Sequence, residues 1–270
     1  MPLLDELNSR FDLSLLSRIA VTTGPGLASC LAIGLSLGRS LSVALDVPLC
    51  GVNHLRGHVF STFLPLHEKD SAGFDETYQS LLPHLGLIVS GGNTVLFEIN
   101  EVREVEMIGE TIDDAAGEAL DKGAKLLGMS YPGGQSIENT ARFGRVDRFD
   151  FPRGMVRSSE IKFSFSGLKT SLRYRLEKLS DMELAQDLPD LCASYQQAVV
   201  DVLVRKTRSV LEWGRYRSLG LSGGVANNKV LRAAFRDLSN DLQVTLMSVS
   251  YTHLRAHETD SYLVCRLLLE

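Results

Sequence analysis

Three glycine-bearing turns recur along the chain, and two of them directly follow an apolar, strand-like run. They are residues 90–94 (Ser-Gly-Gly-Asn-Thr), 131–134 (Tyr-Pro-Gly-Gly) and 221–225 (Leu-Ser-Gly-Gly-Val). A turn without Cβ atoms lets backbone N–H groups close on an anion, and a helix that begins behind it adds about half a positive charge. A single Gly-Gly pair usually only connects two elements. Three of them, near paired histidines and an acidic stretch, predict a nucleotide or acyl-phosphate site between two lobes.

Composition limits what the chain can be. With 270 residues, of which 44% are hydrophobic and 23% charged, it matches a soluble globular protein of one large or two smaller domains. The formal net charge of −5 argues against nucleic-acid binding by the whole surface. Any contact with nucleic acid must therefore be local or shared with a partner.

The cysteines show no Cys-x-x-Cys spacing, and each lies in an apolar stretch. That pattern favours reduced, buried thiols over a disulfide framework or a zinc knuckle. We therefore expect a cytoplasmic protein in which the following residues are buried: Cys30, Cys50, Cys192 and Cys265.

Residues 26–52 form the stretch that most resembles a membrane span. Arg39 and Asp46 interrupt it before it reaches the roughly 20 apolar residues that a span needs. Its mixture of small and large apolar residues instead predicts a buried helix that leads into a strand. The N-terminus lacks the basic region and uncharged core of a signal peptide, and we expect no membrane association.

The periodicity of apolar residues predicts an α/β chain without fixed-length repeats. The expected helices span residues 3–16, 27–45, 118–127, 166–177, 191–213 and 227–238. The expected strands span residues 18–22, 47–52, 85–89, 95–99 and 218–221, and residues 163–165 are expected to be short and extended. The polar residues 67–84 are expected to link two lobes.

Seven motifs follow one another in an order that resembles the tRNA N6-adenosine threonylcarbamoyltransferase family, called TsaD in bacteria. They lie within residues 10–248, at residues 23–27, His54-x-x-x-His58, 89–92, 112–122, 131–134, 163–170 and 223–228. The resemblance implies an actin-like, Hsp70-like (ASKHA) two-lobed fold, with residues 1–66 in the N-terminal lobe and 85–248 in the second lobe. It also implies transfer of a threonylcarbamoyl group from threonylcarbamoyl-AMP to N6 of adenosine 37 in tRNAs that read ANN codons.

The resemblance implies that His54 and His58 bind one divalent metal, Fe²⁺ or Zn²⁺. At a spacing of four on a helix both imidazoles lie on one face, although an isolated pair of this kind is more often a pair of surface residues. The implied substrate-binding residues are Ile88, Val89, Ser90, Gly91, Gly92, Asp121, Gly134 and Asn228. The plainer readings are a hairpin turn at residues 90–92 and an ordinary helix N-cap at Asn228.

No residue is assigned a catalytic role, and the roles of Asp113, Asp114 and Glu118 stay open between orienting water, tRNA or metal and starting a solvated helix. ATP or ADP is an optional further ligand. The implied partners are tRNA, a TsaB-like dimerisation paralogue, a TsaE-like ATPase and the threonylcarbamoyl-AMP synthase. The expected tRNA contacts, weighed against ordinary surface cations, are Arg153, Arg157, Lys162 and Lys169.

The chain also departs from the family pattern. Nothing in it corresponds to the family's opening strand and Glu-Thr-Ser-Cys-Asp-like loop, and Asn93 stands where the family has a histidine. The family's C-terminal Thr-Asp-Asn motif is missing, and residues 249–270 are expected to be foreign, resembling translated adapter sequence. A second metal pair at His253 and His257 is the less favoured alternative there. We therefore expect an incomplete N-terminal lobe, weak metal binding and little activity.

Three other functions compete with this interpretation. A metalloprotease helix needs His-Glu-x-x-His, but Leu55 occupies the position of the glutamate. A carbamoyltransferase or another ATP-dependent enzyme of the actin-like fold is the second, because one fold hosts several chemistries. A non-enzymatic binding paralogue is the third, although such paralogues lack the paired histidines that this chain has.

Overall fold

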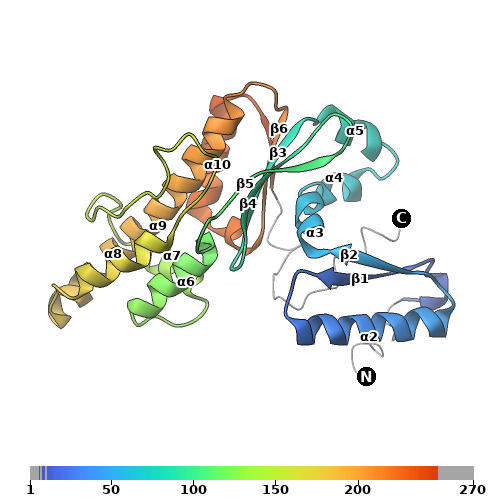
Figure 1. Ribbon diagram of the computed structural model, residues 1–270, viewed down its shortest axis with the longest axis horizontal. Helices are drawn as coiled ribbons and strands as arrows, with labels where there is room; N and C mark the ends of the chain where they lie inside the picture. Colours follow the sequence, from blue (N-terminus) through green and yellow to red (C-terminus); the bar gives the residue numbers. More distant parts are fainter. Residues whose placement is uncertain (1–5, 7, 10, 249–270) are drawn as a thin grey trace.

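The computed structural model describes residues 6, 8, 9 and 11–248, and its α/β architecture confirms the predicted fold class (Figure 1). A five-stranded sheet carries the larger part of the chain, in the order β5-β4-β3-β6-β7. Its strands are β3 (His84–Val89), β4 (Thr94–Ile99), β5 (Val105–Glu110), β6 (Ser218–Ser222) and β7 (Thr245–Ser248). β3 pairs with β4 as an antiparallel hairpin and with β6 in parallel, so the predicted hairpin is confirmed.

One face of this sheet packs against a layer of helices. These helices are α6 (Ala116–Leu126), α7 (Gly133–Ala141), α8 (Ser166–Leu176), α9 (Asp181–Leu211) and α10 (Lys229–Asp241). Side chains alternate along a strand, so Leu85, Leu87 and Val89 of β3 all point into the core that these helices close. The main hydrophobic core of the molecule therefore lies between this face and the helices.

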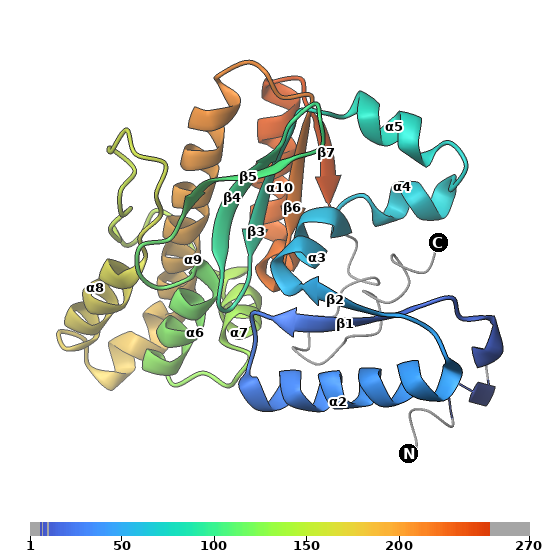
Figure 2. The ribbon, with the colours of Figure 1, turned by 45° about the vertical axis from the view of Figure 1, so that its right-hand side comes forward.

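The opposite face of the sheet carries a smaller core. Ile88 of β3 and Phe97 of β4 pack there against Val59 and Phe63, together with Tyr78 from the segment before β3. The helices on this side are α3 (His54–Ser61), α4 (Leu64–Lys69) and α5 (Phe74–Ser80). Figure 2 shows α3 between the large sheet and the small one, in agreement with its contacts to both.

The first lobe consists of a parallel pair of strands and one long helix. β1 (Ile19–Gly24) pairs with β2 (Leu49–Asn53), and α2 (Ala28–Leu45) connects them. α2 approaches the strands through Gly38, where an added Cβ would lie 3.3 Å from side-chain atoms of Val21 and Leu49. A glycine at this position lets the helix come close to the strand pair.

Several expected elements differ from those observed. Residues 3–16 were expected to form one helix, but residues 13–15 form a separate short 3-10 helix, η1 (Leu13–Leu15). The segment 67–84, expected to be a polar linker, contains α5, and its Tyr78 and Leu82 are buried. α9 begins ten residues earlier than predicted because a capping box at Ser180 and Glu183 starts it.

The prediction that residues 26–52 contain a buried helix is wrong for the described part of the chain. α2 has one buried residue, Gly38, whereas Ile33 and Val43 are 71% and 84% exposed. By length and apolar composition, α2 is also the one described helix that could cross a membrane, with a mean hydropathy of 1.5. The reason for the exposure is that, within the described residues, only the strand pair covers α2.

The burial of the cysteines also differs between α2 and the large core. Cys192 is buried as predicted, and burial raises the pKa of its thiol to about 12. Cys50 is half-buried and Cys30 is exposed, so the prediction of burial is wrong for Cys30, which lies in the first turn of α2. Cys265 lies outside the described residues.

Candidate functional site

The glycine-bearing turns after β3 and β6 lie side by side at the carboxyl ends of their strands. β3 and β6 are parallel neighbours, and Ile88, two residues before Ser90, pairs with Ser222, which directly precedes Gly223. Gly223 has a φ of +92°, and an added Cβ there would lie 2.3 Å from the carbonyl oxygen of Val89. Only glycine fits this contact without strain, because both the backbone conformation and the space exclude a side chain.

The first turn is held closed by its own polar groups. The Ser90 backbone N–H donates to the carbonyl of Asn93 at 2.8 Å, and the Asn93 N–H donates to the Ser90 hydroxyl at 3.0 Å. Gly91 and Gly92 are exposed, with no heavy atom within 4 Å of an added Cβ. The turn therefore offers an open stretch of backbone rather than side chains.

The start of α6 packs directly on this turn. The Gly117 N–H donates to the Ser90 carbonyl at 3.2 Å, and an added Cβ at Gly117 would lie 2.5 Å from that oxygen. The Thr94 hydroxyl accepts a hydrogen bond from the Ala116 N–H at 2.9 Å. The turn and the N-terminus of α6 thus form one unit, and the positive end of the helix dipole lies beside the turn.

The second glycine pair along the chain, Gly133-Gly134, begins α7 and contacts α6. The Asp121 Oδ1 atom accepts a hydrogen bond from the Gly134 N–H at 3.1 Å. An added Cβ at Gly133 would lie 2.7 Å from the Asp121 Cα, so a side chain there would separate the two helices. The resemblance pairs Asp121 with Gly134 in one site, and the structure brings them into contact.

Asn228 lies at the start of α10 and both ends of its amide are bonded. Its Oδ1 accepts from the Leu231 N–H at 3.0 Å, and its Nδ2 donates to the Gln196 Oε1 at 2.7 Å. The Lys229 N–H donates to the buried Glu138 at 3.1 Å. The plainer reading of Asn228 as a helix N-cap is confirmed, and Gln196 and Glu138 support it although no sequence motif marked them.

The paired histidines lie on α3, which begins at a conventional cap. The Asn53 side chain accepts from the backbone N–H groups of Leu55 and Arg56, so the helix starts at His54. The His54 and His58 rings meet edge to face with centroids 4.7 Å apart. Burial, and then the charge of His54, lower the pKa of His58 to about 4, so its imidazole is neutral at neutral pH.

A neutral imidazole is the form that binds a metal, so this pair fits two ligands of a divalent ion. Among the described residues, no group of three histidine, cysteine or acidic side chains could hold a metal. Further ligands would have to come from elsewhere. The alternative second metal pair, His253 and His257, lies outside the described residues.

Asp113, whose role the sequence left open, holds the start of α8. Its carboxylate accepts hydrogen bonds from the Ser164 hydroxyl at 2.6 Å, the Phe165 N–H at 2.8 Å, and both the N–H and the hydroxyl of Ser166. Burial alone would raise the pKa of Asp113, but these hydrogen bonds together outweigh it and lower the pKa. Asp113 is therefore an ionised structural link between the start of α6 and that of α8.

Asp114 and Glu118 also have partners. Both pair with the Lys122 ammonium, at 2.5 and 3.0 Å, on the outer side of α6. The hydrogen bonds to both carboxylates raise the pKa of Lys122. These contacts fit the reading of this stretch as the start of a helix.

The four basic residues expected to contact tRNA fall into two groups. Arg153 bonds to Asp201 and Asp150, and Lys162 pairs with Glu160 at 3.0 Å. Arg157 and Lys169 are exposed, and no carboxylate of the described residues pairs with them. Their geometry therefore leaves two of the four cations free for an anionic ligand.

Comparison with solved structures shows the fold. The chain superimposes on HypF from T. kodakarensis with a TM-score of 0.58 and 14% identity, covering 87% of this chain and 38% of that one. A full-length HypF in its phosphate- and nucleotide-bound form superimposes with a TM-score of 0.57 and 13% identity. This alignment covers 87% of this chain and 44% of that one. These likenesses confirm the predicted actin-like (ASKHA) fold.

Comparison with curated sequences gives the family. Proteins named tRNA N6-adenosine threonylcarbamoyltransferase from Anaeromyxobacter sp. and Trichlorobacter lovleyi are each 42% identical, over 90% and 84% of this chain. The chain spans 70% and 63% of the length of these relatives. The family profile described as TsaD, tRNA N6-adenosine threonylcarbamoyltransferase, matches residues 1–260, twelve residues further than the recognised motifs reach. The chain belongs to this family.

Proposed function

We propose that this chain carries the donor site of an enzyme that transfers a threonylcarbamoyl group from threonylcarbamoyl-AMP to N6 of adenosine 37 in tRNAs that read ANN codons. Its family membership supports tRNA modification in general. The observation that supports the site is the packing of the open turn at residues 90–94 against the N-terminus of α6, at the carboxyl ends of the parallel strands β3 and β6. In open α/β sheets, this is where ligands commonly bind.

The donor would be held mainly by backbone. The exposed amides of Gly91 and Gly92 would contact the phosphate and the acyl group, on the turn that follows Ile88 and Val89. Asp121 uses Oδ1 to bond Gly134, and its Oδ2 has no hydrogen bond among the described residues, so it would accept from a ribose hydroxyl. Asn228 would hold the third turn in place through its cap rather than through direct contact.

His54 and His58 would hold one divalent ion, Fe²⁺ or Zn²⁺. When bound, such an ion supplies a Lewis acid that polarises a substrate oxygen. What this chain contributes is the neutral state of the buried His58 ring and the fixed geometry of the helix that carries both imidazoles.

The proposed reaction balances without a further co-reactant. N6 of the adenosine attacks the carbonyl carbon of the threonylcarbamoyl group, and a C–N bond forms. The bond between that carbon and the phosphate oxygen breaks, AMP leaves, and N6 loses one proton. No described side chain is assigned to take this proton, since Asp113 is ionised but accepts four hydrogen bonds.

The same proposal places the protein in the cytoplasm and gives it partners. A threonylcarbamoyl-AMP synthase would supply the donor, a TsaB-like paralogue and a TsaE-like ATPase would assemble with it, and ATP or ADP would act through that assembly. A carbamoyltransferase or another ATP-dependent enzyme of the actin-like fold, or a non-enzymatic binding paralogue, is the alternative, but the family match favours tRNA modification.

The test is mass spectrometry of digested tRNA. The full-length gene product, with donor, tRNA and the partner subunits, is expected to form the N6-threonylcarbamoyl nucleoside. The His58→Ala variant is expected to lose it, and His67→Ala, a matched histidine change on α4, is expected to retain it. A folded full-length protein that forms no modified nucleoside would overturn the proposal.

A further inference from the structure

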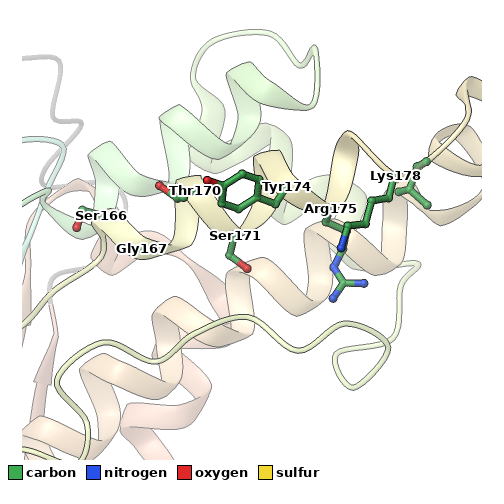
Figure 3. A pocket seen from close by; sticks show the side chains of 8 residues that line it. Ser166, Gly167, Thr170, Ser171, Tyr174, Arg175 and Lys178 are labelled. Carbon is green, nitrogen blue, oxygen red and sulfur yellow. The ribbon is translucent and has the colours of Figure 1, made fainter.

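A groove of about 690 Å³ runs along α8, outside the turns described above (Figure 3). Six of its eight lining residues carry a hydroxyl group or a cation. Its lining residues are Ser166, Gly167, Thr170, Ser171, Tyr174, Arg175, Lys178 and Leu179. Figure 3 shows these side chains succeeding one another along the helix, from Ser166 at its start to Lys178 beyond its end. The eleven residues of α8 span about 16 Å, so the groove is long enough for an extended ligand.

The segment around the groove is basic although the chain is acidic. Residues 166–178 contain four basic residues and one acidic residue, a formal charge of +3, whereas the chain carries −5. The single acid, Glu177, lies 3.7 Å from Arg173, and neither of the two lines the groove. Within the described residues, no carboxylate forms an ion pair with Arg175 or Lys178.

A third cation, Arg148, shares an aromatic ring with Arg175, one of the residues that line the groove. The guanidinium of Arg175 lies 4.9 Å from the centre of the Phe149 ring, and that of Arg148 lies 5.5 Å from the same centre. Phe149 is buried, so it fixes both guanidinium groups where α8 meets the loop after α7. Arg148 likewise has no ion-pair partner among the residues that the structure describes.

The groove begins at the wall of the proposed donor site. Ser166, its first lining residue, is bonded through both N–H and hydroxyl to Asp113, which lies four residues before Gly117. Gly117 in turn bonds the Ser90 carbonyl of the first turn. A polymer lying in the groove would therefore lead toward the donor.

We propose that the α8 groove binds the sugar–phosphate backbone of the substrate tRNA, with Arg148, Arg175 and Lys178 contacting phosphates. Tyr174, which is 54% exposed, and the serine and threonine hydroxyls contact phosphate and ribose oxygens. This proposal rests on the proposed function. Four hydroxyls interleaved with cations favour RNA over an acidic peptide, because phosphate oxygens accept hydrogen bonds from such side chains and 2′-hydroxyl groups both accept from and donate to them.

The experiment measures tRNA affinity of the full-length protein at roughly 50 to 200 mM salt. Removing two phosphate contacts with Arg175→Gln and Lys178→Gln is expected to weaken binding at least tenfold at the lower salt. The slope of log affinity against log salt should fall by about 1.4 to 1.8. The control pair, Arg217→Gln and Arg236→Gln, removes two exposed cations elsewhere and is expected to leave both quantities near those of the parent.

Three outcomes overturn the proposal. The first is an equal loss of tRNA affinity in the test pair and the control pair, which would indicate general electrostatic attraction. Another is displacement of tRNA by poly-glutamate as effective as that by unrelated RNA of equal charge, which would indicate an acidic-peptide site. The third is an unchanged affinity in Lys178→Glu, a single exposed substitution that serves as the test if the Arg175 variant fails to fold.

A separate measurement distinguishes this proposal from the proposed function. Binding of a non-hydrolysable threonylcarbamoyl-adenylate analogue should be unchanged in the Arg175→Gln, Lys178→Gln variant. If the analogue fails to bind the parent protein, the proposed function fails. If the analogue binds and the variant keeps full tRNA affinity, only the groove proposal fails.

Discussion

The two sheets of this molecule differ sharply in how they are covered. Every residue of β3 and β6 is buried, whereas β1 has a single buried residue, Ala20, and β2 has none. The large sheet has a core on both faces, while α2 stands mostly exposed on the small one. The glycine turns of the candidate site therefore follow strands of the better-buried sheet, which sets the positions of the turns.

The first prediction tests this contrast with matched truncations. Leu219→Ala, in the fully buried β6, is expected to lower the free energy of unfolding by about 2–5 kcal/mol, because it removes core contacts and leaves a cavity. Ile33→Ala, in the exposed α2, should change it by less than about 0.5 kcal/mol. Urea unfolding of both variants measures the difference. Equal losses would show that α2 is as well covered as β6.

The second prediction concerns the buried His84, at the start of β3. Its Nδ1 lies 2.7 Å from the Ser218 hydroxyl, which donates to the Leu81 carbonyl, and its Nε2 has no partner among the described residues. Burial lowers its pKa to about 3, so below its ordinary value of 6.5 only the unfolded state takes up the proton. Stability is thus fully present above pH 6.5 and is lost as the pH falls.

From about pH 7.5 to about pH 5, this histidine should account for a loss of about 2 kcal/mol in the free energy of unfolding. The His84→Gln variant should lack this part of the pH dependence, whatever its stability at neutral pH. Unfolding of both proteins in urea across the range measures it. Parallel pH profiles for the two proteins would contradict the prediction.

The third prediction concerns Lys206, a buried cation on α9. Its ammonium donates to the carbonyls of Ser158 and Glu160, at 2.8 and 2.6 Å, and so holds the loop that precedes α8. Lys206→Met is expected to lower the free energy of unfolding by about 1–3 kcal/mol, because two carbonyls lose their hydrogen-bond donor. The same change at the exposed neighbour Arg205 should cost less than about 0.5 kcal/mol. Limited proteolysis should also cut near residue 158 sooner in the Lys206 variant, and equal cutting of both variants would refute the role.

The fourth prediction compares helix starts in the two lobes. α9 begins at the capping box of Ser180, whereas α2 begins at Leu27 without a side-chain cap. Ser180→Ala should destabilise the protein by about 1 kcal/mol, and Leu27→Ser should stabilise α2 by about 0.5–1 kcal/mol. Hydrogen exchange in the first turn of each helix measures both effects. Slower exchange in α9 after Ser180→Ala would contradict the account.

The parts of the fold that the sequence predicted are those where local pattern and tertiary packing agree. The β3–β4 hairpin follows from apolar runs around a Ser-Gly-Gly turn. β5 was missed because Val105–Glu110 is an edge strand with charged residues, and α7 because it opens with two glycines. α7 is helical through its packing against α6 and α9, which no local signal reports.

In the candidate site, the sequence predicted which residues lie together in two pairs but not the contacts between distant segments. Sequence spacing placed His54 and His58 on one face of a helix, and the family resemblance placed Asp121 and Gly134 in one site; the members of each pair lie together in the structure. The Asn228–Gln196 contact joins residues 32 positions apart, and the four hydrogen bonds to Asp113 join residues about 50 apart. Contacts between residues so far apart in the sequence depend on the assembled fold. They cannot be predicted from the type of any single residue.

The most direct test of the donor site is calorimetric titration of the protein with a non-hydrolysable threonylcarbamoyl-adenylate analogue. The parent should bind it saturably, with one site per chain. Gly117→Ala should abolish or strongly weaken binding, because its Cβ would lie 2.5 Å from the Ser90 carbonyl and displace the turn. The same substitution at Gly34, where the nearest atom would be 3.8 Å away, should leave binding intact. Equal binding by both folded variants would contradict a donor site built on this turn.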